Sequence, residues 1–353
     1  MEFQADEKYV KVHGRTLVID GVRYINYSAS AIEFTFTGTK AEAVLTSDFK
    51  YEEWSKYQFA AQAAVLVNGE MTQRFMLTDS EKTYTLFESE QPQTVTVKLV
   101  KMSEAAFGKV GIKKLIVEGT TPVPTPKKQR RIEFDGDSIT CGYGIEGVYN
   151  VDQFCTEQEN PLTNYAGILT RELDADSNYV SWSGIGVISR WVPETEDKPL
   201  DDWLFPMIYP CTDAGYSNDL KQQPFEQWDF SRFQPDVVVL FLGTNDLSYT
   251  RHVDERVNHF GTEYGRLLDY IMEKNPTAQI FCTLGVMGQD LCEEIEKQVK
   301  LKNSDRVHYV QLDVQKDEDG IGADWHPSEK SHQKVAAKLK EEICRVMNLN
   351  VQI

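Results

Sequence analysis

The sequence predicts a two-domain protein in which an all-β domain of the jelly-roll or β-sandwich type precedes a doubly wound α/β domain. A chain of 353 residues is longer than most single hydrophobic cores, which favours two domains. Its first third shows short runs of alternating apolar and polar residues, whereas the remainder alternates strand-like and helix-like segments. We expect the β domain at residues 1–122, a linker at 123–130 and the α/β domain at 131–353.

Strand signals recur along the N-terminal part of the chain. Apolar and polar residues alternate over 32–37, which is the period of a half-buried strand. An apolar run ending at Val67 leads into Asn68-Gly69, a dipeptide typical of tight hairpin turns. The alternating prolines of segment 120–126 then exclude a helix and favour an extended connector. No group of catalytic side chains is evident before this connector.

The C-terminal part reads as alternating strands and helices. Its clearest strand, at 236–242, is almost continuously apolar, as a strand buried on both faces of a parallel sheet must be. Further strands are expected at 132–134, 179–182, 279–284 and 307–312, and helices at 161–173, 260–271 and 335–346. The active site of such a domain lies outside the carboxyl ends of its strands.

Composition narrows the range of functions. The net charge of −18 argues against nucleic acid and anionic membranes as partners, but does not oppose a neutral carbohydrate. No apolar stretch reaches the roughly 20 residues needed to cross a bilayer. The opening MEFQADEKYV lacks the features of a secretory signal, so we expect a cytoplasmic protein, or a secreted one if a leader has been removed. No metal-ligand pattern is visible, and we expect neither a metal nor a cofactor.

Three positions after predicted strands carry groups suited to acyl transfer. Ser138 follows the first strand of the α/β domain, where a hydroxyl is exposed beside backbone N–H groups. Asn245 follows the clearest strand, and its side-chain amide can donate to an oxyanion. Gly184 follows the second strand and can present its N–H without an intervening side chain. Each has an ordinary alternative, such as Asp137 or Ser138 capping a helix and Asn245 forming a turn.

A general base is expected ahead of the last helix. His326 has a side chain whose pKa lies near neutrality, and Asp324 stands two residues earlier. In an extended segment such side chains point the same way, so the carboxylate would orient the imidazole; a plain turn is the alternative. Together the residues supply a nucleophile, a base and three oxyanion donors, namely the N–H groups of Ser138 and Gly184 and the Asn245 amide. The combination is a much stronger signal than any one member.

On these residues the chain resembles the SGNH, or GDSL-type, hydrolases. The matching blocks are Gly136-Asp137-Ser138, Ser183-Gly184, Gly243-Thr244-Asn245-Asp246 and Asp324-Trp325-His326-Pro327. With a β domain in front and the Asp-Trp-His-Pro-Ser form of the last block, the whole chain resembles carbohydrate esterase family 2. The resemblance implies a serine esterase that removes acetyl groups from xylan, mannan or glucomannan through an acyl-enzyme. SGNH enzymes usually carry the acidic residue three positions before the histidine, where this chain has Ala323. Asp324 resembles the arrangement of some family members, while others use a Ser-His dyad.

Aromatic residues are frequent between the glycine and asparagine blocks, and exposed rings suit the apolar faces of sugars. We expect Trp203 and Tyr209, which have prolines nearby, and Trp325, beside the base, to contact substrate; core packing is the alternative for each. Two other functions stay open. One is an esterase for another small acyl ester, of the lipid, thioester or sialate type, and the other is a non-catalytic glycan-binding protein. The oligomeric state is not predicted.

Overall fold

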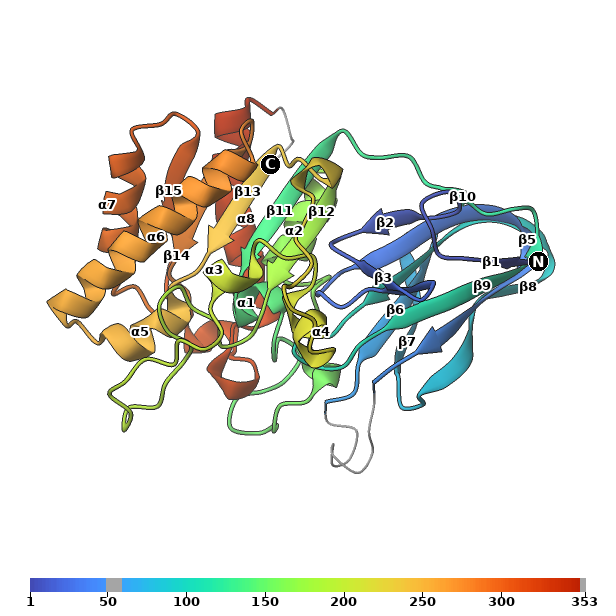
Figure 1. The fold of residues 1–353 in the computed structure, drawn as a ribbon, viewed down its shortest axis with the longest axis horizontal. Coiled ribbons are helices and arrows are strands. Elements are labelled where there is room, and N and C mark those ends of the chain that lie inside the picture. Colours follow the sequence, from blue (N-terminus) through green and yellow to red (C-terminus); the bar gives the residue numbers. More distant parts are fainter. Residues whose placement is uncertain (49–58, 350–353) are drawn as a thin grey trace.

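The computed structural model describes residues 1–48 and 59–349, which form two domains lying side by side (Figure 1). All strand pairings of the first domain are antiparallel, whereas the second domain contains a five-stranded parallel sheet flanked by helices. The predicted fold class, a doubly wound α/β domain preceded by an all-β domain, is therefore confirmed.

In the residues that the structure describes, the N-terminal domain is a set of ten antiparallel strands joined by hydrogen bonds into one branched sheet. Its strands are β1 (Glu2–Phe3), β2 (Lys11–His13), β3 (Leu17–Ile19), β4 (Val22–Tyr24), β5 (Ala31–Thr46), β6 (Gln62–Val67), β7 (Glu70–Met76), β8 (Glu81–Lys101), β9 (Gly111–Gly119) and β10 (Val123–Pro124). They pair in the order β3-β4-β9-β5-β8-β6-β7, with β1 joined to β9 and both β2 and β10 joined to β5. The hairpin turn predicted at Asn68-Gly69 connects β6 to β7.

The long strands β5 and β8 connect the two halves of this domain. They pair with each other along most of their length, while β5 pairs first with β2 and β10 and then with β9. The register shifts at Gly38, where an added Cβ would lie 2.1 Å from the carbonyl oxygen of Glu118. Only glycine tolerates that approach, so Gly38 lets β5 bend from one set of neighbours to the next.

The C-terminal domain alternates strands and helices as the sequence predicts. The strands are β11 (Arg130–Gly136), β12 (Ala175–Ser181), β13 (Val237–Phe241), β14 (Gln279–Leu284) and β15 (Val307–Gln311), and the helices are α1 (Ser138–Cys141), α2 (Tyr165–Glu172), α3 (Phe205–Ile208), α4 (Ala214–Asp219), α5 (Thr244–Thr250), α6 (Asp254–Lys274), α7 (Cys292–Lys302) and α8 (Glu329–Met347). The sheet order is β12-β11-β13-β14-β15, with α2 packed against α8 and α6 against α7. The winding direction therefore reverses between β11 and β13, and ligands of such folds bind at this switch point.

The two domains share a buried interface. The edge strand β12 faces the β domain (Figure 1), and Tyr27 and Ala105 of that domain join the hydrophobic core of the α/β domain. Arg15 is fully buried; it donates to the carbonyl of Cys211 at 3.0 Å and lies 3.4 Å from the Glu133 carboxylate. A buried charge is costly unless partners surround it, so these contacts stabilise one relative placement of the domains.

The segment expected to be a linker is partly structured. Val123 and Pro124 pair with β5 as strand β10, and β11 begins at Arg130, so the connection without strand structure spans 125–129. Across the two described ranges, 1–48 and 59–349, no helix has the length and apolar character needed to cross a membrane.

Candidate active site

Three of the predicted site residues follow neighbouring strands of the parallel sheet. Gly136, the last residue of β11, pairs with Ser181, the last residue of β12, and with the end of β13. The segments that continue from these ends carry Ser138, Gly184 and Asn245. Because parallel strands end at one edge of a sheet, the three residues gather at the switch point between β11 and β13.

Ser138 begins α1 immediately behind β11. The preceding Asp137 caps this helix, because its carboxylate accepts from the Ile139 N–H at 3.0 Å. The capping alternative therefore applies to Asp137 and leaves the Ser138 hydroxyl free for other contacts. Burial raises the pKa of Asp137 to about 7. The turn needs glycine at Gly136, where an added Cβ would lie 2.1 Å from the Thr140 hydroxyl oxygen.

His326 lies next to Ser138 although 188 residues separate them in sequence. The His326 Nε2 atom is 2.8 Å from Ser138 Oγ, which is hydrogen-bond distance. The Tyr143 ring lies against the imidazole, with centroids 4.4 Å apart, and is itself stacked on Phe154 at 3.6 Å. These rings hold the plane of the imidazole toward Ser138.

Backbone carbonyls hold the second nitrogen of the imidazole. His326 Nδ1 lies 3.1 Å from the carbonyl oxygen of Asp324 and 3.3 Å from that of Ala323. Since carbonyls only accept, they assign the proton to Nδ1 and leave Nε2 to accept the proton of Ser138. Burial lowers the pKa of His326 to about 4, against the opposing effects of the carbonyls and of the Asp324 charge. The imidazole is therefore neutral at neutral pH, as a general base must be.

Asp324 does not take the position predicted for its side chain. The spacing suggested an extended segment, but Asp324 has φ 49° and Trp325 has φ 64°, both left-handed. These two residues belong to a 3₁₀ turn (Ala323–Trp325) that directs the Asp324 carboxylate to the Tyr143 hydroxyl, which donates to it at 3.0 Å. The expected contact between carboxylate and imidazole is thus replaced by the contact between the Asp324 carbonyl and His326 Nδ1.

Asn245, the second residue of α5, contacts the loop that carries Gly184. Gly184 has φ 76°, and a Cβ added there would meet no atom within 4 Å, so the space beside its backbone is open. The Asn245 side-chain amide donates to the Ile185 carbonyl at 2.8 Å and lies 3.4 Å from the Asp137 carboxylate. The amide has one short hydrogen bond and one long contact, so its second N–H is weakly held and suited to donate to a developing oxyanion.

Asp246 holds the same loop, a role that the sequence did not reveal. Its buried carboxylate accepts from the backbone N–H groups of Val187, Ile188 and Ser189, the shortest at 2.7 Å from Ile188. Burial raises the pKa of Asp246 to about 6, while these hydrogen bonds oppose the rise. The signal that could have found it is its place beside Asn245 in the third motif block.

The aromatic residues predicted to bind substrate differ in exposure. Tyr209 is 0% exposed, and its hydroxyl donates to the Glu133 carboxylate at 2.9 Å, so the prediction that Tyr209 contacts substrate is wrong. The prolines nearby suggested a loop, but Pro206 stands in the first turn of α3, where proline is well tolerated. Trp203 is half-buried and packs edge-on against Trp182, with centroids 5.3 Å apart.

Two tryptophans adjoin the site and remain exposed. Trp325 precedes the base and is 40% exposed. Trp191, which the sequence pattern did not single out, is 58% exposed, and its backbone N–H donates to the Gly184 carbonyl at 2.9 Å. The residue that carries this exposed ring is therefore bonded through its backbone to the glycine loop. The exposure of Trp191 and its backbone hydrogen bond to Gly184 could not be predicted from the spacing of aromatic residues in the sequence.

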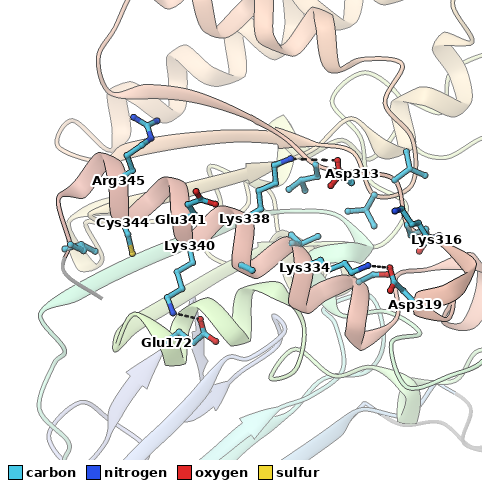
Figure 2. A pocket seen from close by; sticks show the side chains of 18 residues that line it. Glu172, Asp313, Lys316, Asp319, Lys334, Lys338, Lys340, Glu341, Cys344 and Arg345 are labelled. Atoms are coloured by element: carbon cyan, nitrogen blue, oxygen red, sulfur yellow. Dashed lines mark hydrogen bonds and ion pairs between the residues drawn. The ribbon is translucent and has the colours of Figure 1, made fainter. Parts of the chain in front are cut away.

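A groove of about 1120 Å³ lies elsewhere, along α8 and the segment after β15 (Figure 2). Lys334 contacts Asp319 there, and Lys340 lies 3.0 Å from Glu172, so these lysines are neutralised by ion pairs. Neither Ser138 nor His326 lines this groove. In the part of the chain that the structure describes, no group of three or more histidine, cysteine or carboxylate side chains is placed to hold a metal ion.

Two family models match the chain, one in each domain. The carbohydrate esterase 2 N-terminal model matches residues 12–126, and the GDSL-like lipase/acylhydrolase model matches residues 134–334. The cellulase/esterase CelE of Acetivibrio thermocellus is 32% identical over 326 residues, which are 90% of this chain but 37% of CelE. An acetylxylan esterase/glucomannan deacetylase of Cellvibrio japonicus is 28% identical over 350 residues, covering 98% of this chain and 90% of that protein.

Solved structures are similar over the whole chain. A family two carbohydrate esterase from Clostridium thermocellum, in complex with cellohexaose, has a TM-score of 0.82 at 30% identity, covering 96% of this chain and 99% of that one. The acetyl xylan esterase Est2A from Butyrivibrio proteoclasticus has a TM-score of 0.85 at 23% identity, which supports the fold alone. The resemblance inferred from the four motif blocks and the preceding β domain is confirmed by these matches.

Proposed function

Because the chain belongs to carbohydrate esterase family 2, we propose that it is a serine esterase that removes O-acetyl groups from plant polysaccharides or their oligosaccharides. The observation that carries the proposal is the contact of 2.8 Å between His326 Nε2 and Ser138 Oγ at the switch point of the sheet. Hydrolysis of an acetyl ester by this pair needs no cofactor.

The chemistry follows from the protonation state of the pair. His326 accepts the hydroxyl proton through Nε2 while Ser138 Oγ attacks the acetyl carbonyl carbon. The oxyanion that forms is assigned to the N–H groups of Ser138 and Gly184 and to the Asn245 amide. The imidazolium then protonates the departing sugar oxygen, and the acetyl group remains on Ser138. Water, deprotonated by the same imidazole, attacks the acetyl carbon; the bond to Ser138 Oγ then breaks, the imidazolium returns the proton to Oγ, and acetate leaves.

The surroundings of the pair support a carbohydrate as the alcohol part of the ester. Trp191, whose backbone is bonded to the glycine loop, and Trp325, which directly precedes the base, have exposed rings, and aromatic rings suit the apolar faces of sugar rings. A net charge of −18 does not repel a neutral glycan. Relatives named as an acetylxylan esterase/glucomannan deacetylase agree with xylan or glucomannan as the backbone.

Acetate release from a panel of acetylated xylan, mannan and glucomannan oligosaccharides tests this function, with the deacetylated positions assigned by NMR. We expect release by the unmodified protein and none by Ser138→Ala. Long-chain acyl esters and acetylated sialic acid serve as comparison substrates. Faster turnover of those compounds than of every acetylated oligosaccharide would favour another acyl ester as substrate, and binding without acetate release would favour a glycan-binding protein.

A further inference from the structure

A carboxylate from the β domain reaches the glycine loop of the α/β domain. Glu104 lies in the segment between β8 and β9 and is fully buried. One of its oxygens accepts from the backbone N–H of Ser183 at 2.8 Å, and the other accepts from the Ser183 hydroxyl. Ser183 directly precedes Gly184, so the contact is made one residue before the expected oxyanion donor.

Glu104 is itself held in place by a buried polar network. Its own backbone N–H donates to the Glu159 carboxylate at 2.8 Å, and its carbonyl accepts from the Lys101 ammonium at 2.6 Å. Lys101 is fully buried and also donates to the Ser103 carbonyl at 2.9 Å. The segment that carries Glu104 is thus folded around the buried Lys101 side chain, which gives the carboxylate little freedom to move.

The loop that receives this contact is held on its far side by the asparagine block. The Asn245 amide binds the carbonyl of Ile185, and Asp246 binds the N–H groups of residues 187–189. The near side, before Gly184, contacts Glu104. Since Gly184 has the conformational freedom of glycine and open space beside it, the direction of its N–H depends on how its neighbours are held.

From this geometry we infer that Glu104 is a positioning residue for the esterase reaction: it orients the Ser183-Gly184 peptide so that the Gly184 N–H faces the oxyanion. The inference rests on the proposed function, and it makes a residue of the β domain support the oxyanion site of the other domain. Glu104 acts through Ser183 and does not itself touch the substrate. Burial raises the pKa of Glu104, while the two hydrogen bonds from Ser183 favour its charged form.

Glu104→Gln tests the inference, because the amide keeps the size of the side chain but cannot accept from both Ser183 donors in the same way. We expect kcat for p-nitrophenyl acetate to fall roughly tenfold or more, with KM changed less than about twofold, since a displaced donor acts on the transition state. Ser183→Ala removes one of the two hydrogen bonds from the other partner. Because both variants disturb the same contact, the decrease in kcat of the double variant should be smaller than the product of the decreases in the two single variants.

Asp176→Asn is the matched control. Asp176 is also a buried carboxylate at the domain interface, bound by Lys11 and by the Lys128 N–H, but it lies near the start of β12, at the opposite end from the active site. We expect a comparable change in melting temperature with unaltered kcat. Equal kcat for Glu104→Gln and the control would overturn the inference, as would full activity of Ser183→Ala if Glu104→Gln does not fold. Failure of the unmodified protein to hydrolyse p-nitrophenyl acetate would instead overturn the proposed function.

Discussion

The two sides of the active site are built by different means. Ser138, Gly184 and Asn245 stand just beyond the ends of three adjacent parallel strands, so the sheet itself gathers them. His326 instead follows a 3₁₀ turn whose last two residues have left-handed backbones, with Tyr143 packed against the ring. The strand side is regular and local, whereas the histidine side depends on particular backbone angles and distant contacts. This difference determines both what the sequence could reveal and how each side should respond to substitution.

The largest decrease in activity is expected from substitution of Ser138, which follows β11 on the strand side and contacts His326 on the histidine side. Ser138→Ala removes the nucleophile, so kcat for p-nitrophenyl acetate should fall by about 10⁴-fold or more, as in other serine hydrolases. Initial rates at saturating ester measure the loss. Ser231→Ala, at an exposed turn, is the control and should leave kcat unchanged. Near-normal turnover by Ser138→Ala would place the reaction elsewhere in the protein.

A smaller effect is expected on the strand side. Asn245→Ala removes one assigned oxyanion donor together with the hydrogen bond to the Ile185 carbonyl, so kcat should fall by about 10²- to 10³-fold. Asn258→Ala, on the exposed face of α6, is the control. Steady-state kinetics with p-nitrophenyl acetate separate kcat from KM. A rise in KM at constant kcat would show that Asn245 binds the ground state instead.

These two predictions concern residues that the sequence could identify, for a physical reason. The apolar run at β13 and the short strand at β11 have strong local signals, and the carboxyl ends of parallel strands must lie together. The position of Ser138 and Asn245 therefore follows from secondary structure alone. His326 was identifiable because it is a histidine close to an acid and ahead of α8.

The remaining features depend on contacts that leave no local signal. Tyr209 looked like a loop residue, but it is buried against Glu133, which lies 76 residues earlier in the chain. Glu104 meets Ser183 across 79 residues and a domain boundary. A left-handed backbone is usually signalled by glycine, and position 324 is an aspartate. The spacing of Asp324 and His326 therefore suggested an extended segment. Periodicity and turn signals describe local structure, so they do not predict contacts between residues that are far apart in the sequence.

The pH dependence sharpens the description of the histidine side. Burial lowers the pKa of His326 to about 4, and the reaction requires the neutral imidazole. We therefore expect kcat/KM to remain nearly constant from roughly pH 7 to 5.5 and to decline about tenfold per pH unit below pH 4. An imidazole with its ordinary pKa near 6.5 would already have lost about nine-tenths of its activity at pH 5.5. Circular dichroism at each pH shows whether the fold persists. The buried acids Asp137 and Asp246, with pKa values raised to about 7 and about 6, also titrate in this range, so a midpoint near 6.5 contradicts the assigned environment of His326 only if it persists in Asp246→Asn.

A further test addresses the substrate. Trp191→Ala keeps the backbone N–H that donates to the Gly184 carbonyl but removes the exposed ring. We expect KM for an acetylated oligosaccharide to rise about tenfold, equivalent to a loss of about 1.4 kcal/mol in binding, with p-nitrophenyl acetate kinetics nearly unchanged. Leu200→Ala, another exposed apolar side chain of the same insertion, is the control. Equal effects on both esters would show that the ring supports the catalytic loop and does not bind sugar.

The smallest effect is expected at the acid that the sequence placed in a triad. The imidazole Nδ1 contacts the backbone carbonyls of Ala323 and Asp324, so Asp324→Asn removes a charge near His326 but keeps the groups that hold it. We expect kcat at pH 7 to change less than about threefold, whereas loss of a carboxylate that binds the imidazole directly typically costs about 10⁴-fold. Tyr143→Phe, which removes the hydroxyl donor to Asp324 but keeps the ring against His326, should give a similarly small change.

A much slower turnover in Asp324→Asn alone, by about a hundredfold or more, would show that the carboxylate turns to the imidazole during the reaction. The backbone carbonyls of Ala323 and Asp324 would then be insufficient to orient the base. In that case the two sides of the site would both depend on polar side chains aimed at the reacting atoms, and the left-handed turn before His326 would describe only the resting enzyme.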